Sequence, residues 1–371
     1  MYPPSGPQGP SPVIPDLPPV DPNDHYDDFV PKPLPSRHGE LRVQLALFVA
    51  TFFTTTMVGG CHYDGFMTDM STLGSAPTVT LNEALGQLRG RLADPLFWVH
   101  GLWYSLSILA ILGCHEMGHY VMCLRYNVDA TRPYFLPAPL PLTGTLGAFI
   151  RLRSRIPSKI ALFDIGIAGP IAGFVIAVPA LFVGLMLSRL DRLPDDLSRF
   201  DELGEPLLFQ FAAWMIWGDV PATHGLNMHP MAFAAWFGLL ATALNLFPIG
   251  QLDGGHISYA VLGRRSTTVT LAMMGAAIGL TFVSMSWLVW TILMTVMILM
   301  LGPHHPPTLD DDQQLGRGRL VLAGVALAML IVCFTPAPIG PFVGAPSEHR
   351  ERIDVNRDAL DELRLARHGE P

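Results

Sequence analysis

Seven apolar segments, each close to the length of a membrane-spanning helix, constrain the fold of this chain more than any other feature. They lie at roughly 42–60, 96–124, 161–187, 230–247, 267–284, 286–302 and 319–336. A helix needs about 20 mostly apolar residues to cross the hydrocarbon core of a bilayer. Hydrophobic residues make up 50% of the chain and charged residues only 15%, whereas about 25% are charged in an average soluble domain. The sequence therefore predicts an all-α polytopic membrane protein, embedded in a lipid bilayer, with about six or seven transmembrane helices.

The charges of the loops predict how these helices are oriented. Residues 125–160 carry six basic side chains and one acidic one, whereas residues 188–229 carry three basic and seven acidic ones. Because cytoplasmic loops are enriched in lysine and arginine, the first loop is predicted inside and the second outside. The net charge of −8 argues against a protein that binds nucleic acid, since such proteins usually present a basic face.

Both ends of the chain are polar. Residues 1–36 are rich in proline and acidic residues, which predicts a disordered cytoplasmic tail. Residues 337–371 are predicted to form a polar C-terminal tail with a short surface helix near 355–367. Because the chain is rich in arginine, has two lysines and shows no transit-like N-terminal segment, a multi-pass protein of the bacterial inner membrane is expected.

The second apolar segment contains a pattern typical of metal-binding helices, His115-Glu116-Met117-Gly118-His119. Residues four apart share one face of a helix, so both imidazoles can reach a single Zn²⁺. Glu116 lies beside that face, where it can act as a base toward a water molecule. A carboxylate inside a spanning segment costs at least roughly 2.5–3.5 kcal/mol, which a bound cation would offset. An ion pair between helices is the alternative, but these segments offer Glu116 no basic partner.

A third ligand is expected after the fourth apolar segment, in the run from Asn245 to His256. Catalytic zinc sites usually have three protein ligands and one open position. Pro248 interrupts the helix, and irregular backbone is tolerated within a membrane where it lines a protein cavity. The chain can therefore bend and bring Asp253 to the metal; the alternative is a plain turn residue before Gly254. His256 follows one turn later and is interpreted either as a neighbour of the ligands or as a packing residue.

These patterns resemble the site-2 proteases, a family of intramembrane zinc metalloproteases, and look most like its bacterial and plastid branch. The resemblance rests on residues 115–119, on residues 245–256, and on a glycine-rich stretch at 144–150 and 163–173. The first pattern alone is shared with many zinc peptidases, whereas the three together, in this order and within apolar segments, are specific. A membrane-embedded metalloprotease domain is thus expected at 37–336, with its core at 95–262.

The resemblance implies a zinc endopeptidase that hydrolyses a peptide bond in or near a transmembrane segment of a membrane-protein substrate, in regulated intramembrane proteolysis. His115, His119 and Asp253 would bind one Zn²⁺, and Glu116 would be the general base. Asn245 would donate a hydrogen bond near the developing oxyanion or hold the substrate backbone. A hydrogen bond between helices is the alternative for Asn245.

A small membrane-associated β element is expected near residues 135–155. Residues 135–141 contain too much proline for a helix. Residues 144–153 alternate small or polar residues with apolar ones, which is typical of a strand. The family resemblance implies that this element lies at the membrane, where its exposed edge would capture an unwound substrate segment by main-chain pairing. A plain cytoplasmic hairpin is the alternative.

Three further features have mainly structural interpretations. Gly166, Gly169 and Gly173 place a face of small residues on the third apolar segment, which predicts close packing against another helix. Asp164 is expected to cap that helix or to face its positive end. The histidines at 304–305 are interpreted as part of a rigid exit turn, with a second metal site as the alternative.

Two other functions are compatible with polar residues in spanning segments. A metal transporter would need ligands along a path across several helices, whereas the candidate ligands cluster at one depth. A catalytically silent membrane scaffold of the same fold would have no use for Glu116, yet the motif is intact.

Overall fold

The computed structural model describes residues 37–71, 80–138, 140, 142–194, 201–302 and 304–341. The tail predicted for 1–36, residues 342–371 of the C-terminal tail and the surface helix expected near 355–367 lie outside these residues. The chain divides into two compact units, Met1–Arg42 and Val43–Pro371. Every contact of the candidate site lies within the second unit.

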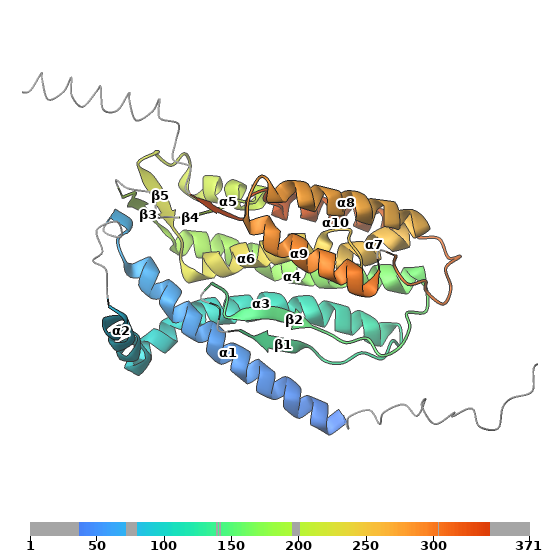
Figure 1. Ribbon diagram of the computed structural model, residues 1–371, viewed down its shortest axis with the longest axis horizontal. Coiled ribbons are helices and arrows are strands. Elements are labelled where there is room, and N and C mark those ends of the chain that lie inside the picture. Colours follow the sequence, from blue (N-terminus) through green and yellow to red (C-terminus); the bar gives the residue numbers. More distant parts are fainter. Residues whose placement is uncertain are drawn as a thin grey trace, which may run out of the picture. The chain divides into compact units, whose positions relative to one another are not determined.

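Helices account for most of the described chain (Figure 1). They are α1 (Arg37–Met67), α2 (Leu81–Ala93), α3 (Pro95–Arg125), α4 (Lys159–Leu187), α5 (Leu207–Trp217), α6 (Pro230–Leu246), α7 (Asp253–Leu262), α8 (Ser266–Thr281), α9 (Ser286–Leu301) and α10 (Arg317–Cys333). Each of the seven apolar segments falls on one of these helices. The prediction of a mostly helical protein is therefore confirmed.

Three of the described helices are long and apolar enough to cross a membrane, judged by length and composition alone. They are α1 over Gly39–Met67, α3 over Pro95–Arg125 and α4 over Lys159–Leu187. Shorter apolar helices occupy Leu207–Trp217, Pro230–Leu246 and Ser286–Met300. The count of six or seven spans stays a prediction.

Local signals explain where the two central helices begin. The Asp94 side chain caps α3, and Pro95 occupies its first position, where a missing N–H removes no helical hydrogen bond. The Ser158 hydroxyl caps α4 by accepting from a backbone amide of the first turn. Of the two roles expected for Asp164, capping the helix is therefore wrong. Asp164 lies in the second turn and forms an ion pair with Arg319 instead.

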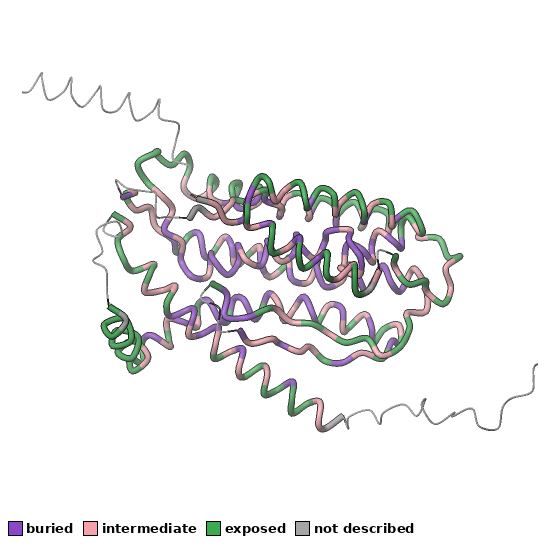
Figure 2. Tube along the Cα trace, viewed as in Figure 1, coloured by how far each residue is buried: buried purple, intermediate pink, exposed green. Residues whose placement is uncertain are grey.

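Buried residues concentrate on α3, α4 and α6, which pack against one another (Figure 2). Tyr104, Leu181 and Trp236, one from each helix, are at most 1% exposed. The approach of α3 to α4 depends on glycine, since a Cβ on Gly118 would lie 2.4 Å from the Ala168 carbonyl oxygen. The face of small residues predicted on α4 therefore does pack against neighbouring helices, with Gly169 and Gly173 facing α3 and Gly166 facing α7.

Three small antiparallel sheets accompany the helices in the described residues. They pair β1 (Tyr134–Pro137) with β2 (Thr145–Phe149), β3 (Arg189–Arg192) with β5 (His224–Asn227), and β4 (Asp201–Leu203) with β6 (Ile339–Pro341). The β1–β2 hairpin lies along α3 (Figure 1), where the Tyr104 hydroxyl donates to the Thr143 carbonyl oxygen at 2.9 Å. The strand expected within 144–153 is β2.

Candidate metal centre

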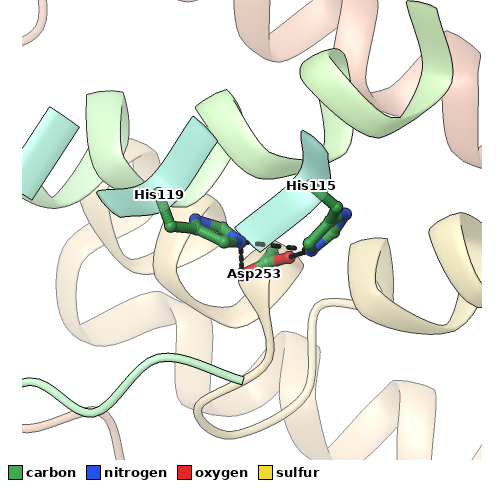
Figure 3. A group of neighbouring side chains, drawn as sticks. All are labelled: His115, His119 and Asp253. Atoms are coloured by element: carbon green, nitrogen blue, oxygen red, sulfur yellow. Dashed lines mark hydrogen bonds and ion pairs between the residues drawn. The ribbon is translucent and has the colours of Figure 1, made fainter. Parts of the chain in front are cut away.

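Three donor side chains from two helices that are far apart in the sequence meet between α3 and α7 (Figure 3). The Nε2 atoms of His115 and His119 are 3.1 Å apart. They lie 3.2 and 3.3 Å, respectively, from the two carboxylate oxygens of Asp253. One donor atom from each side chain lies within 4.8 Å of the others, a spacing that can hold a metal ion.

The spacing and the chemistry of these donors fit zinc. Bonds of about 2.0–2.1 Å in a tetrahedral zinc site place neighbouring donor atoms about 3.3–3.4 Å apart. The distances from the imidazole nitrogens to the Asp253 oxygens are 3.2 and 3.3 Å. Two imidazoles and one carboxylate also leave a fourth position open, as catalytic zinc sites do. All four cysteines, including Cys114 beside the motif, are free thiols outside this group.

A backbone carbonyl of α4 sets the orientation of the His119 ring. His119 Nδ1 lies 2.7 Å from the Ile165 carbonyl oxygen. Because a carbonyl only accepts, Nδ1 must carry a proton and donate. The neutral ring then keeps its lone pair on Nε2, the atom that faces Asp253. The contact with α4 thus selects the tautomer that can bind a metal.

Two glycines of α4 make room for the histidine rings. A Cβ on Gly169 would lie 2.1 Å from His119 Nε2, and a Cβ on Gly173 would lie 3.1 Å from His115 Cβ. Any larger residue at position 169 must therefore displace the ring whose nitrogen faces the centre. The small-residue face of α4 shapes the site as well as the packing.

A break between α6 and α7 brings Asp253 to the histidines. α6 ends at Leu246 and α7 begins at Asp253. Pro248, in between, has no amide with which to continue a helix, and Gly250 has a positive φ of 54°, which glycine tolerates best. A Cβ on Gly254 would lie 2.0 Å from the Leu246 carbonyl oxygen. Glycine therefore lets the chain fold back tightly at this point.

Asn245 and Glu116 also lie at the site. The Asn245 amide Nδ2 is 3.3 Å from His115 Nε2. Glu116 is only 8% exposed, and its carboxylate lies near the backbone amide of Ile150, the residue that follows β2. The structure thus brings the predicted ligands, the predicted base and Asn245 into one region, while their roles stay predictions.

Sequence reasoning missed two polar clusters beside this centre. In the first, Arg319 of α10 donates to both carboxylate oxygens of Asp164, at 2.8 and 2.7 Å, and the Tyr126 hydroxyl donates to the same carboxylate. In the second, His256 Nδ1 lies 2.7 Å from His305 Nε2. A carboxylate in an apolar helix needs a partner, so the position of Asp164 was a signal for the first cluster.

The second cluster continues into the loop after α9. The Tyr259 hydroxyl donates to Asp311 at 2.5 Å. Burial opposes the ionisation of Asp311, but hydrogen bonds from Thr308 and Tyr259 keep the pKa of its carboxyl below the usual value. Burial also lowers the pKa of the His305 imidazole, which favours the neutral ring. The hydrogen bond between the two histidines joins α7 to this loop.

The fold and the site define a class of helical membrane proteins in which one helix carries a paired-histidine motif and a broken helix adds an aspartate to the same metal-binding group. The chain belongs to peptidase family M50, the family of the site-2 proteases: the model of this family matches residues 103–286, about half of the chain. The resemblance inferred from the motifs is thereby confirmed.

Several curated plant proteins are similar to this chain. It is 29% identical over 239 residues to the probable zinc metalloprotease EGY1, chloroplastic, of Arabidopsis thaliana. This match covers 62% of this chain and 42% of that protein. It is 30% identical over 251 residues to the probable zinc metalloprotease EGY2, chloroplastic, of Oryza sativa subsp. indica, with coverages of 65% and 44%. It is also 30% identical over 260 residues to the probable zinc metalloprotease EGY3, chloroplastic, of Oryza sativa subsp. japonica, with coverages of 65% and 43%. The chain thus spans less than half the length of these relatives.

Proposed function

We propose that this chain is an intramembrane zinc endopeptidase that hydrolyses a peptide bond in or near a transmembrane segment of a membrane-protein substrate, as in regulated intramembrane proteolysis. His115, His119 and Asp253 would hold one Zn²⁺. The convergence of these three donors, with Glu116 next to them, is the observation that carries the proposal. Membership of peptidase family M50 supports it, as do the relatives named probable zinc metalloproteases.

Glu116 would be the general base. It follows His115 in the motif, it is buried, and its carboxylate lies near the Ile150 amide. The same group would take a proton from the attacking water and then deliver it to the leaving amine nitrogen. Zinc would supply Lewis acidity, which polarises the scissile carbonyl and makes water a stronger acid.

Asn245 would bind the substrate. Its Nδ2 group lies 3.3 Å from His115 Nε2. With the lone pair of that nitrogen taken by a metal, the amide N–H would be free to donate to a substrate oxygen. A donor aimed at the oxygen that gains negative charge in the transition state lowers the barrier to acyl transfer.

The β1–β2 hairpin would hold the unwound substrate segment. Ile150 directly follows β2 and contacts Glu116, so a peptide lying along β2 would pass close to the base. Among the described residues, β2 has β1 as its one neighbouring strand. An extended peptide can add to the other edge of such a strand through main-chain hydrogen bonds.

The setting of the enzyme is part of the proposal. The metalloprotease domain would occupy 37–336 with its core at 95–262, and six or seven helices would span the bilayer. The arginine-rich chain favours the bacterial inner membrane, whereas the names of the relatives place those proteins in chloroplasts. Membrane fractionation of the source cells distinguishes the two locations.

Substitution of the proposed base tests the function. Membranes that contain the wild type or Glu116→Gln are compared by mass spectrometry for new N-termini inside transmembrane segments, and the purified proteins are analysed for zinc. We expect Glu116→Gln to retain zinc and to lower cleavage at least about 100-fold, since general acid–base groups contribute at least that much. Asp219→Asn, which removes an exposed carboxylate, is the matched control and should cleave normally.

Two outcomes would replace the proposal. If zinc is bound but the pattern of N-termini is the same for wild type and Glu116→Gln, the chain is a scaffold of this fold without catalysis. If vesicles take up zinc through the wild type and not through His119→Ala, the chain is a metal transporter.

A further inference from the structure

The segment 304–319, which comprises most of the α9–α10 loop and the first turn of α10, contacts α7, which carries Asp253, and α4, which packs against the histidine-bearing α3. It lies beyond the residues 103–286 that the family model matches. Its contacts form the two polar clusters already described. The Arg319 cluster consists of Arg319, Asp164 and Tyr126, and the His305 cluster consists of His305, His256, Tyr259 and Asp311.

The Arg319 cluster joins three helices at one carboxylate. The guanidinium of Arg319, on α10, binds both oxygens of Asp164, on α4. A two-point pair of this kind fixes direction as well as distance. Tyr126, the residue after α3, donates to the same carboxylate. The Asp164 side chain is only 14% exposed, so solvent screens the pair less than it would on an open surface.

Asp164, at the centre of the Arg319 cluster, directly precedes Ile165, whose carbonyl oxygen orients the His119 ring. Ile165 follows Asp164 directly, and its carbonyl oxygen accepts the Nδ1 proton of His119 at 2.7 Å. Any shift of this turn of α4 relative to α3 changes that hydrogen bond and hence the direction of the His119 lone pair. Arg319 is thus linked to a metal ligand through one side chain and one backbone carbonyl.

The His305 cluster contacts α7, the helix that carries Asp253. His305 Nδ1 donates to the Pro306 carbonyl oxygen at 2.6 Å, so the neutral ring accepts at Nε2, and the donor there is His256 Nδ1. The Tyr259 ring stacks on His305, with the ring centroids 4.5 Å apart, and its hydroxyl binds Asp311. Two positions of α7 are thereby tied to the loop.

His256 connects this loop to the aspartate ligand. It lies one helical turn after Asp253 on α7. α4 closes on it from the other side, because a Cβ on Gly166 would lie only 3.0 Å from His256 Cβ. The first turn of α7 is therefore held between α4 and the loop, and the loop bonds to the linker before α4 through the Asp310 amide and the Pro157 carbonyl oxygen, 3.0 Å apart.

We propose that the segment 304–319 positions the metal-binding group, with Arg319 setting His119 through Asp164 and Ile165, and His305 setting Asp253 through His256. Arg319 and His305 are positioning residues, since neither belongs to the group of donors. The inference rests on the metal binding of the proposed function and does not require peptidase activity. Loss of the Arg319 or the His305 side chain should weaken zinc binding about tenfold, the lower end of the range for residues that hydrogen-bond to metal ligands.

Metal affinity and the spectrum of a substituted metal test the proposal on the full-length protein purified in detergent. Zinc affinity is measured by competition with a chelator, and the absorption of bound Co²⁺ reports the ligand geometry. Arg319→Met should lower the affinity and shift the cobalt spectrum, whereas Arg319→Lys should retain part of both. Arg317→Met is the matched control, because this exposed arginine lies two residues earlier on the same helix.

The role of His305 is tested by a variant and a matched control. His305→Phe keeps a ring that can stack on Tyr259 but removes the hydrogen bond to His256, so zinc affinity should fall. His304→Phe changes the exposed neighbour and should bind zinc like the wild type. Thermal unfolding of every variant shows whether a loss of zinc affinity comes from unfolding of the protein or from a change in the geometry of the metal-binding group. If Arg319→Met does not fold, the exchanged pair Asp164→Arg with Arg319→Asp is measured instead, and it should recover zinc affinity.

Failure of this inference differs from failure of the proposed function. Folded Arg319→Met and His305→Phe with the affinity and cobalt spectrum of the wild type would overturn the positioning role. Equal losses in the two control variants, or no recovery in the exchanged pair, would overturn it as well. If instead the wild type binds zinc no better than His119→Ala, the three donors do not form a zinc site, and this result contradicts the proposed function as well.

Discussion

Both α4 and α8 contain glycines within a continuous helix, but the surroundings of these glycines differ. On α4, a Cβ at Gly169 would overlap the His119 ring, and the glycine that faces α4 from α3, Gly118, lies against backbone. On α8, a Cβ at Gly275 or Gly279 would have no neighbouring atom within 4 Å. The contrast shows that a glycine in an apolar helix indicates close packing only where another chain segment occupies the space of the missing side chain.

The largest effect is expected for Gly169→Ala. The new Cβ would lie 2.1 Å from His119 Nε2, so the ring must leave its position and take a metal-binding nitrogen with it. Zinc affinity should fall at least about 100-fold, the upper end of the range for changes behind metal ligands. Chelator competition on the purified protein measures the loss. Wild-type affinity in a folded Gly169→Ala protein would show that His119 is not a ligand.

Gly118→Ala should act mainly on stability. Its Cβ would lie 2.4 Å from the Ala168 carbonyl oxygen, and backbone cannot rotate away as a side chain can. α3 and α4 must separate locally, with an expected cost of about 1–3 kcal/mol. The midpoint of unfolding in denaturing detergent reports this loss. An unchanged midpoint would mean that the two helices are packed less closely than the structure indicates.

Gly173→Ala tests an intermediate contact. Its Cβ would lie 3.1 Å from His115 Cβ and 3.4 Å from His115 Nδ1, so a shift of a few tenths of an ångström relieves the overlap. Zinc affinity should fall about tenfold or less. In the same competition assay, Gly173→Ala should lose clearly less zinc affinity than Gly169→Ala. A larger loss for Gly173→Ala would contradict the placement of the two histidine rings.

The smallest effect is expected for Gly279→Ala on α8. The new methyl group meets open space, and alanine is favoured over glycine inside a helix by about 0.5–1 kcal/mol. Zinc affinity should be unchanged, and stability should be unchanged or slightly higher in the same unfolding assay. A marked loss of stability would reveal a partner for α8 that the single chain does not show.

Much of the fold follows from local signals. Each of the seven apolar segments falls on a helix, because a long apolar run satisfies its own backbone hydrogen bonds only as a helix when it lies in lipid. Alternation at 144–153 indicated β2, and Pro248 indicated the end of α6. The spacing of His115 and His119 placed both on one helical face for the same kind of reason, since helical periodicity is local.

Other contacts of the structure join side chains that are far apart in the sequence. An aspartate near the start of an apolar segment suggests a helix cap, yet Ser158 caps α4 and Asp164 pairs with Arg319. The histidines at 304–305 looked like a turn, and one of them bonds to His256. Neither partner could be predicted, because many basic and polar residues occur in the chain and sequence spacing does not rank them.

By itself, the sequence determined the apolar helices, the histidine-bearing face of α3 and the positions where glycine or proline permits a close approach or a break. These properties depend on neighbouring residues, whose chemistry acts over one or two helical turns. Only the tertiary structure decided that Asp253 meets both rings, that the Ile165 carbonyl orients His119, and that α10 reaches back to α4. Such contacts arise when whole helices pack, and packing selects a few of the many pairings that local patterns leave open.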